Sequence, residues 1–158
     1  MYKKILVPLD GSKLAECVLP HLETVFKGAE TPEVVLVQAV EPYSIPYGRE
    51  VGQFTSLEQV KEFETHQKTD AEKYLKIIAA RLGRTGINAM TEVIYGKAIE
   101  ALTGYINGNE IDLVIMATHG RSGISRRIWG GVADHLLRSV CTPILMIRAP
   151  GCVPGSPA

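Results

Sequence analysis

Residues able to bind a small polar ligand follow three apolar runs of the chain. Asp10-Gly11-Ser12 comes after residues 4–9 (KILVPL), Glu41 after residues 34–40 (VVLVQAV), and Thr118–Gly123 (THGRSG) after residues 112–117 (DLVIMA). A carboxylate such as that of Asp10 can accept hydrogen bonds from ribose hydroxyls or from an amine donor like that of adenine. Glycines in the third segment would let the backbone approach a ligand closely.

A second pattern favours an anion at the start of the last expected helix. Gly130-Gly131 precedes its apolar face, and the free N–H groups and dipole at a helix N-terminus attract negative charge. Residues 117–148 hold five arginines and a single acid, Asp134, in a chain whose formal net charge is zero. These features predict a nucleotide with its base near Asp10 and Val40 and its phosphates near Gly120 and Gly130-Gly131.

The same residues also fit a purely structural role. Asp10-Gly11-Ser12 could be only a turn followed by a helix cap. Gly130-Gly131 could be a plain loop-to-helix junction, and the arginines could form a solvated face. Composition and spacing leave both interpretations open.

Other chemistry finds little support in the spacing of residues. The sequence has no Walker A lysine motif and no GxGxxG, which argues against a P-loop or a dinucleotide site. The four histidines lack metal-ligand spacing and are interpreted as structural or surface residues, although His119 lies in the segment expected to meet phosphates. No Ser–His–acid set or carboxylate pair can be argued from spacing, so no catalytic residue is assigned.

Alternating strands and helices must position these residues. Strands are expected at residues 4–9, 34–40, 89–95, 112–117 and 143–148, and helices at 15–26, 57–82, 98–106 and 132–140. Such alternation predicts βαβ units, and therefore a parallel sheet covered on both faces by right-handed crossovers. Ligands of open sheets of this kind bind beyond the carboxyl ends of the strands.

Two local irregularities stand out in this pattern. Pro20 lies inside the first helical periodicity and should kink that helix or loosen one turn. Residues 41–56 carry two prolines and two glycines without periodicity, which predicts a long loop. Long loops in compact domains are often lids, so we expect a flap near the base end of the site.

Length and composition set the limits of the protein class. A chain of 158 residues and 17.2 kDa, 46% hydrophobic and 22% charged, is expected to form one α/β domain over residues 1–149, with a flexible tail over 150–158. Zero net charge gives no global attraction to nucleic acid or to an acidic membrane. The three cysteines, without CxxC spacing, favour a reducing, cytoplasmic location. No apolar run approaches the ~18 residues of a membrane span.

From Lys3 to Arg148 the chain resembles the universal stress protein family. Members open with a strand like KILVPLDGS and close with a pattern like HGRSGISR…G…VAD…CTPILMIR, both present here. ATP-binding members carry Gly, two residues, Gly, nine residues, Gly, then Ser or Thr. Gly120 and Gly130 match this pattern, while Ala117 replaces the first glycine and Gly131 the terminal Ser or Thr. The change at residue 131 removes a hydroxyl but keeps the backbone N–H.

The resemblance implies a Rossmann-like fold of the adenine-nucleotide alpha-hydrolase type, with five parallel strands in the order 3-2-1-4-5. It also implies a stress-linked regulatory module that binds ATP, ADP or AMP, with Mg²⁺ accompanying the phosphates, and that forms a homodimer through Pro143 to Arg148. The implied nucleotide contacts are Pro8, Leu9, Asp10, Gly11, Ser12, Ala39, Val40, Met116, Ala117, His119, Gly120, Arg121, Gly123, Gly130, Gly131, Val132 and Ala133.

Two alternatives belong to other functional classes. The chain could be a dimerising interaction protein that does not bind ATP, or a slow ATPase or phosphotransferase. The presence of Asp10, Gly120 and Gly130 argues against the first alternative, and the missing hydroxyl at Gly131 argues against the second.

Overall fold

A computed structural model describes residues 2–26, 32–43, 57–118 and 131–148 of the chain. The expected strands and helices form, most of them with ends within a residue or two of the predicted ones. The strands are β1 (Lys4–Pro8), β2 (Glu33–Val40), β3 (Ala89–Tyr95), β4 (Leu113–Ala117) and β5 (Ile144–Ile147). The helices are the 3₁₀ helix η1 (Ala15–Val18), α1 (Leu19–Phe26), α2 (Leu57–Gly83), α3 (Ala98–Gly108) and α4 (Gly131–Ser139).

The strands form one parallel sheet in the order β3-β2-β1-β4-β5, which confirms the predicted order. The central strand β1 pairs with β2 on one side and with β4 on the other, so that Leu6 lies between Val35 and Val114. Pairing with β2 continues past the end of β1, since the Leu9 N–H donates to the Val37 carbonyl at 2.8 Å. The loop that follows β1 therefore starts from a fixed position.

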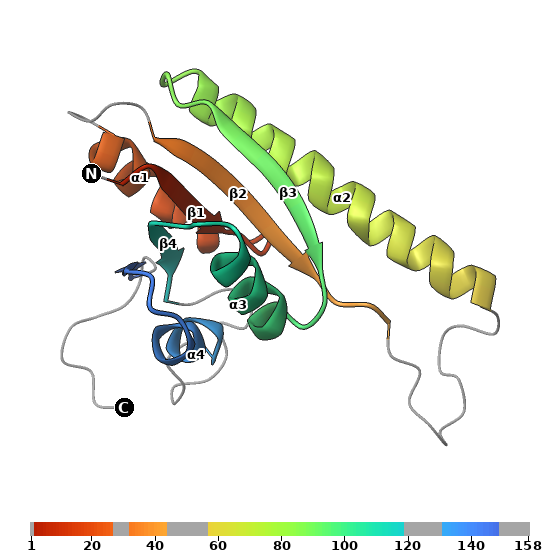
Figure 1. The fold of residues 1–158 in the computed structure, drawn as a ribbon. Helices are drawn as coiled ribbons and strands as arrows, with labels where there is room; N and C mark the ends of the chain where they lie inside the picture. Colours follow the sequence, from red (N-terminus) through yellow and green to blue (C-terminus); the bar gives the residue numbers. More distant parts are fainter. Residues whose placement is uncertain (1, 27–31, 44–56, 119–130, 149–158) are drawn as a thin grey trace, which may run out of the picture.

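Helices cover both faces of the sheet, with η1, α1 and α2 on one face and α3 and α4 on the other (Figure 1). Because successive side chains of a strand point to opposite faces, β1 contributes to two cores. Ile5 and Val7 pack in the core beneath α1 and α2, and Leu6 packs in the core beneath α3 and α4. A strand buried on both faces is a continuous apolar run in sequence, as β1 is.

The irregularity expected at Pro20 lies just before this residue. The chain forms one 3₁₀ turn, η1, and then the α-helix α1, with Pro20 in the first turn of α1. A proline fits there, because the N–H that it lacks would have no intrahelical partner in a first turn.

Two sequence expectations differ from the structure. Phe63 was expected on the buried stripe of α2, but its side chain is 36% exposed and packs edge-on against the Tyr43 ring. Asp112 was expected as the first residue of a strand, but it precedes β4. Its carboxylate accepts the backbone N–H groups of Lys4 and Lys3, each at 2.8 Å. These hydrogen bonds hold the pKa of Asp112 below its usual value and join the starts of β1 and β4.

We predict that Leu75→Ala destabilises the protein strongly. Leu75 of α2 is fully buried in the core beneath α1 and α2, and truncating a buried leucine costs about 2–5 kcal/mol of unfolding free energy. Ile77→Ala is the matched control, because Ile77 lies on the same helix and is 66% exposed. Urea unfolding should show a change of less than about 0.5 kcal/mol for the control. Equal losses for both variants would contradict the assigned orientation of α2.

Candidate functional site

The carboxyl ends of β1, β2 and β4 meet at one edge of the sheet. The direction of winding reverses at β1, because β2 and β3 lie on one side of it and β4 and β5 on the other. Open sheets leave a ligand-binding crevice at such a reversal. The structure thus brings together predicted site residues that are far apart in sequence: Pro8 to Ser12, Ala39 and Val40, and Met116 and Ala117.

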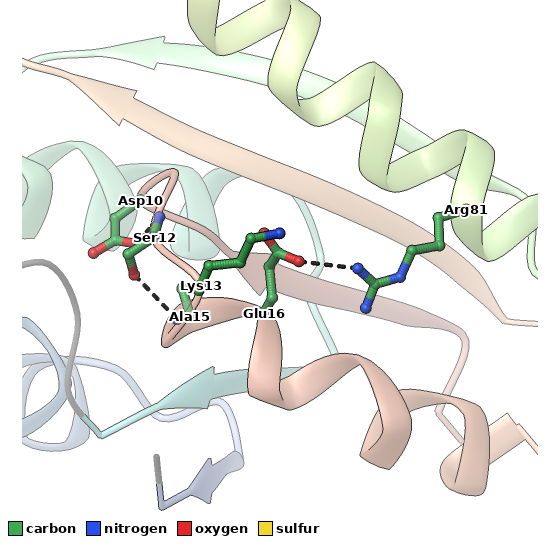
Figure 2. Close-up of polar contacts among 6 residues, drawn as sticks. All are labelled: Asp10, Ser12, Lys13, Ala15, Glu16 and Arg81. Atoms are coloured by element: carbon green, nitrogen blue, oxygen red, sulfur yellow. Dashed lines mark hydrogen bonds and ion pairs between the residues drawn. The ribbon is translucent and has the colours of Figure 1, made fainter. Parts of the chain in front are cut away.

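The segment after β1 forms both a turn and a cap. The Ser12 N–H donates to Asp10 Oδ1 at 2.9 Å, and the Ala15 N–H donates to Ser12 Oγ at 3.1 Å (Figure 2). Gly11 between them has a φ of +81°, a backbone conformation that L side chains rarely adopt. The structural role that the sequence allowed is therefore real, and it fixes the Asp10 carboxylate at the edge of the sheet.

An ion pair between a buried carboxylate and a half-exposed guanidinium holds α2 against this segment. Arg81 Nη1 of α2 lies 2.9 Å from Glu16 Oε2 of η1 (Figure 2), and the Glu16 side chain is only 9% exposed. The Lys13 ammonium lies 3.5 Å from the other carboxylate oxygen of Glu16. Because half of the Arg81 side chain is exposed, solvent screens the pair on that side, and its main effect is a directional contact between α2 and η1. Helix α2 is thus held to the segment that contains Asp10.

A cavity of about 500 Å³ lies between the segment after β1, the end of β2 and α2. Three predicted site residues line it: Gly11, Ala39 and Val40. The other lining residues were missed from the sequence: Gln38, Glu41, Gln67, Asp70, Ala71 and Tyr74. The sequence held one signal for a lining residue: Gln38 is the single polar residue of the apolar run from 34 to 40.

Two residues that line the cavity each have a buried polar atom without a hydrogen-bond partner among the described residues. The atoms are Gln38 Oε1 of β2 and the Tyr74 hydroxyl of α2. Burial raises the pKa of Tyr74 to about 12, and the carboxylates of Glu16 and Asp10 contribute to the rise, while Arg81 opposes it. The Tyr74 hydroxyl therefore keeps its proton at neutral pH and remains a hydrogen-bond donor.

The two carboxylates of the cavity wall have partners outside the cavity. Glu41 Oε1 accepts the Ala98 N–H at the start of α3 at 3.3 Å. Asp70 Oδ1 lies 3.9 Å from the Lys73 ammonium, one turn further along α2. Among the described residues, no lysine or arginine lines the cavity. The described part of the wall is therefore polar and acidic.

Several predicted contacts are buried in the cores. Leu9 packs beneath α1 and α2, while Met116 and Ala133 pack beneath α3 and α4. Their buried side chains leave the backbone as the part that a ligand at this edge would meet. Gly131, in contrast, is the exposed first residue of α4, and nothing lies within 4 Å of the position that a Cβ would take there.

Part of the predicted site lies outside the described residues: His119, Gly120, Arg121, Gly123 and Gly130. The same holds for most of the expected flap, residues 44–56. Its first part is attached to α2, since the Tyr43 N–H donates to Glu64 Oε1 at 3.1 Å. Over the described ranges, no three His, Cys, Asp or Glu side chains come together as a metal site. No helix in the same ranges has the length and apolar character to cross a membrane.

Comparison with known proteins agrees with this architecture. The Universal stress protein family model matches residues 1–148. Universal stress protein MJ0577 of Methanocaldococcus jannaschii is 26% identical over 94% of this chain and 96% of its own. The solved MJ0577 structure superposes with a TM-score of 0.75 at 24% identity, covering 96% of this chain and 99% of that one.

Two similar solved structures contain nucleotides. A universal stress protein in complex with cAMP has a TM-score of 0.66 at 17% identity, covering 94% of this chain and 98% of that one. An Arabidopsis thaliana family protein with AMP bound also has a TM-score of 0.66, at 13% identity, covering 94% of this chain and 93% of that one. With its sheet order and nearly its whole length matched, the chain belongs to the universal stress protein family.

Proposed function

We propose that this protein is a regulatory module that binds an adenine nucleotide at the carboxyl edge of its sheet. The observation that carries the proposal is the meeting of Asp10, Val40 and Ala117 at the reversal of strand order. The cAMP and AMP complexes of similar proteins support an adenine nucleotide as the ligand class. The cysteine usage supports a cytoplasmic location.

The charges and helix ends suggest how the ligand lies. The base and ribose would lie near Asp10 and Val40, where the wall is acidic. The phosphates would point toward the N-terminus of α4, where Gly131 has no side chain to obstruct a ligand and the helix dipole favours an anion. The described residues offer no cluster of acidic or histidine ligands, so we assign no magnesium site to them. Mg²⁺ would enter with the phosphates of ATP.

Titration calorimetry with AMP and with ATP tests the proposed binding. We expect both nucleotides to bind, and ATP to bind only modestly tighter than AMP, because residue 131 has no hydroxyl to donate to a terminal phosphate. Mass spectrometry of small molecules released on heat denaturation identifies any ligand that copurifies. Absence of binding to either nucleotide at millimolar concentration would contradict the proposal.

We predict that Gly131→Ser raises ATP affinity about tenfold, the equivalent of about 1.4 kcal/mol, while AMP affinity hardly changes. The space around residue 131 is open, and a hydrogen bond to a charged group contributes about 1.5–3 kcal/mol. At an exposed helix start we expect the lower end of that range.

Gly131→Ala is the control for the prediction at residue 131, because it adds the Cβ without the hydroxyl. Calorimetry on all three proteins should show the gain in ATP affinity for serine alone. Equal gains for AMP and ATP would mean that residue 131 does not face the terminal phosphates.

We also propose a homodimer through β5. This strand lies at the outer edge of the sheet and pairs only with β4 among the described strands. Its Leu145 is 36% exposed, and Leu137 of the neighbouring α4 is 44% exposed. An unpaired, apolar edge strand tends to pair with another chain, and a two-fold axis would let the two copies of β5 do so.

We expect light scattering at micromolar concentration to give twice the chain mass of 17.2 kDa, and Leu145→Glu to shift the protein toward monomer. The reason is that a charge would be buried at the two-fold contact of β5 with its copy. Met90→Glu is the control, because Met90 is exposed on β3, the outer strand on the other side of the sheet from β5. A wild-type mass of 17.2 kDa would contradict the dimer, and loss of the dimer in Met90→Glu alone would move it to β3.

A further inference from the structure

Helix α3 begins without a side-chain cap of its own. Its N-cap residue is Lys97, which makes no side-chain cap hydrogen bond within the described part of the chain. The first N–H groups of a helix have no intrahelical acceptor, and a serine, threonine, aspartate or asparagine at the N-cap usually supplies one. A lysine cannot do so, because its ammonium group only donates.

The acceptor comes instead from the end of β2. Glu41 Oε1 accepts the N–H of Ala98, the first residue of α3, at 3.3 Å, although the two residues are 57 positions apart in sequence. The negative charge of the carboxylate also suits the positive end of the helix dipole. The residue that follows β2 thus caps the helix that follows the neighbouring strand β3.

A second hydrogen bond joins the same two segments. The Gly96 N–H donates to the Val40 carbonyl at 3.1 Å, next to the last pair of β2 with β3, Val40 with Tyr95 (Figure 1). Gly96 has a φ of +129°, a conformation that L side chains rarely adopt, so the sequence specifies this turn. Two hydrogen bonds therefore hold residues 40 and 41 to the start of α3.

This connection reaches the candidate site. Val40 and Glu41 both line the cavity at the edge of the sheet where we expect the nucleotide. Helix α3 is a firm anchor, because its Leu102 and Ile106 are buried in one core with α4. A cap at residue 97 would satisfy α3 and leave the end of β2 with one hydrogen bond fewer. The distant cap satisfies α3 and holds the end of β2 as well.

We propose that Glu41 is a positioning residue for the nucleotide site: by capping α3 it fixes the backbone of Val40, where we expect the base. This inference rests on the proposed function and deepens it. Two other roles would be a cap that serves α3 alone and a carboxylate that contacts the ligand directly. The three roles differ in their effects on stability, on affinity and on the backbone of the ligand-free protein.

Three variants separate these roles. Glu41→Ala removes the acceptor, and Glu41→Gln retains an oxygen that can accept the same N–H. Lys97→Ser in the Glu41→Ala background gives α3 a local cap, because a serine followed three residues later by Glu100 forms a capping box. Lys97 is exposed, so the substitution disturbs no packing.

We expect Glu41→Ala to lower the melting temperature and to weaken binding of AMP and ATP by the same factor, about threefold to fivefold, the scale of one lost cap. Glu41→Gln should retain most of both. Adding Lys97→Ser to Glu41→Ala should restore the melting temperature but not the affinities, because the local cap does not touch β2. Titration calorimetry and thermal unfolding measure the two effects.

Hydrogen exchange of the Gly96 amide in the ligand-free protein gives a further readout. It should be faster in Glu41→Ala and remain faster after Lys97→Ser is added, because the Gly96–Val40 hydrogen bond has lost its neighbour. Glu33→Ala is the matched control, since Glu33 is an exposed glutamate at the amino end of β2, 3.4 Å from the Lys4 ammonium. It should leave the affinities and the exchange of Gly96 unchanged.

Four results would overturn the inference. Unchanged affinities in Glu41→Ala would overturn it and leave the proposed function intact. Recovery of affinity on adding Lys97→Ser would show a cap that serves α3 alone. Weaker binding with unchanged exchange of Gly96 would show that the carboxylate contacts the ligand directly. Absence of AMP and ATP binding to the wild-type protein would overturn the proposed function and this inference together.

Discussion

Backbone pairing of β1 with strands on both of its sides is the constraint on which the site depends. β1 lies between β2 and β4, and its side chains are buried in cores on both faces of the sheet. Because the strands are parallel, this pairing sets the carboxyl ends of β1, β2 and β4 at one edge. Asp10 and Val40 are 30 residues apart in sequence, and Ala117 is much further along the chain. They share an edge for this reason alone.

The second requirement is the position of α2. The apolar stripe of this helix packs on the sheet through Leu75, Ile78 and Leu82, and its Arg81 is paired with Glu16 in the segment that follows β1. Apolar packing alone would fix the distance between helix and sheet with less control over sliding along the strands. The ion pair adds a directional contact. It fixes one wall of a cavity whose opposite wall is the end of β2.

The sequence was sufficient to predict the fold and some of the residues that meet at the candidate site. Strands buried on both faces are uninterrupted apolar runs, so their bounds and the α/β class could be predicted, and the resemblance to the family implied the strand order. Asp10-Gly11-Ser12 was found because its turn chemistry is local. Tyr74 was missed because its position in α2 is also that of a core residue, and only the packing of α2 on β2 shows that Tyr74 and Gln38 line one cavity. Phe63 was misplaced for a similar reason, since the Tyr43 ring packs against it.

The most direct measurement is a titration of the ¹⁵N-labelled protein with ATP, followed by amide chemical shifts. We expect the largest shifts at the carboxyl edge, at Ser12, Val40, Thr118 and Gly131, and at Tyr74 of α2. Amides at the amino ends of the strands, such as those of Lys4 and Glu33, should hardly move. Shifts confined to the amino ends of the strands, or no shifts at saturating ATP, would contradict an adenine-nucleotide site at the reversal of strand order.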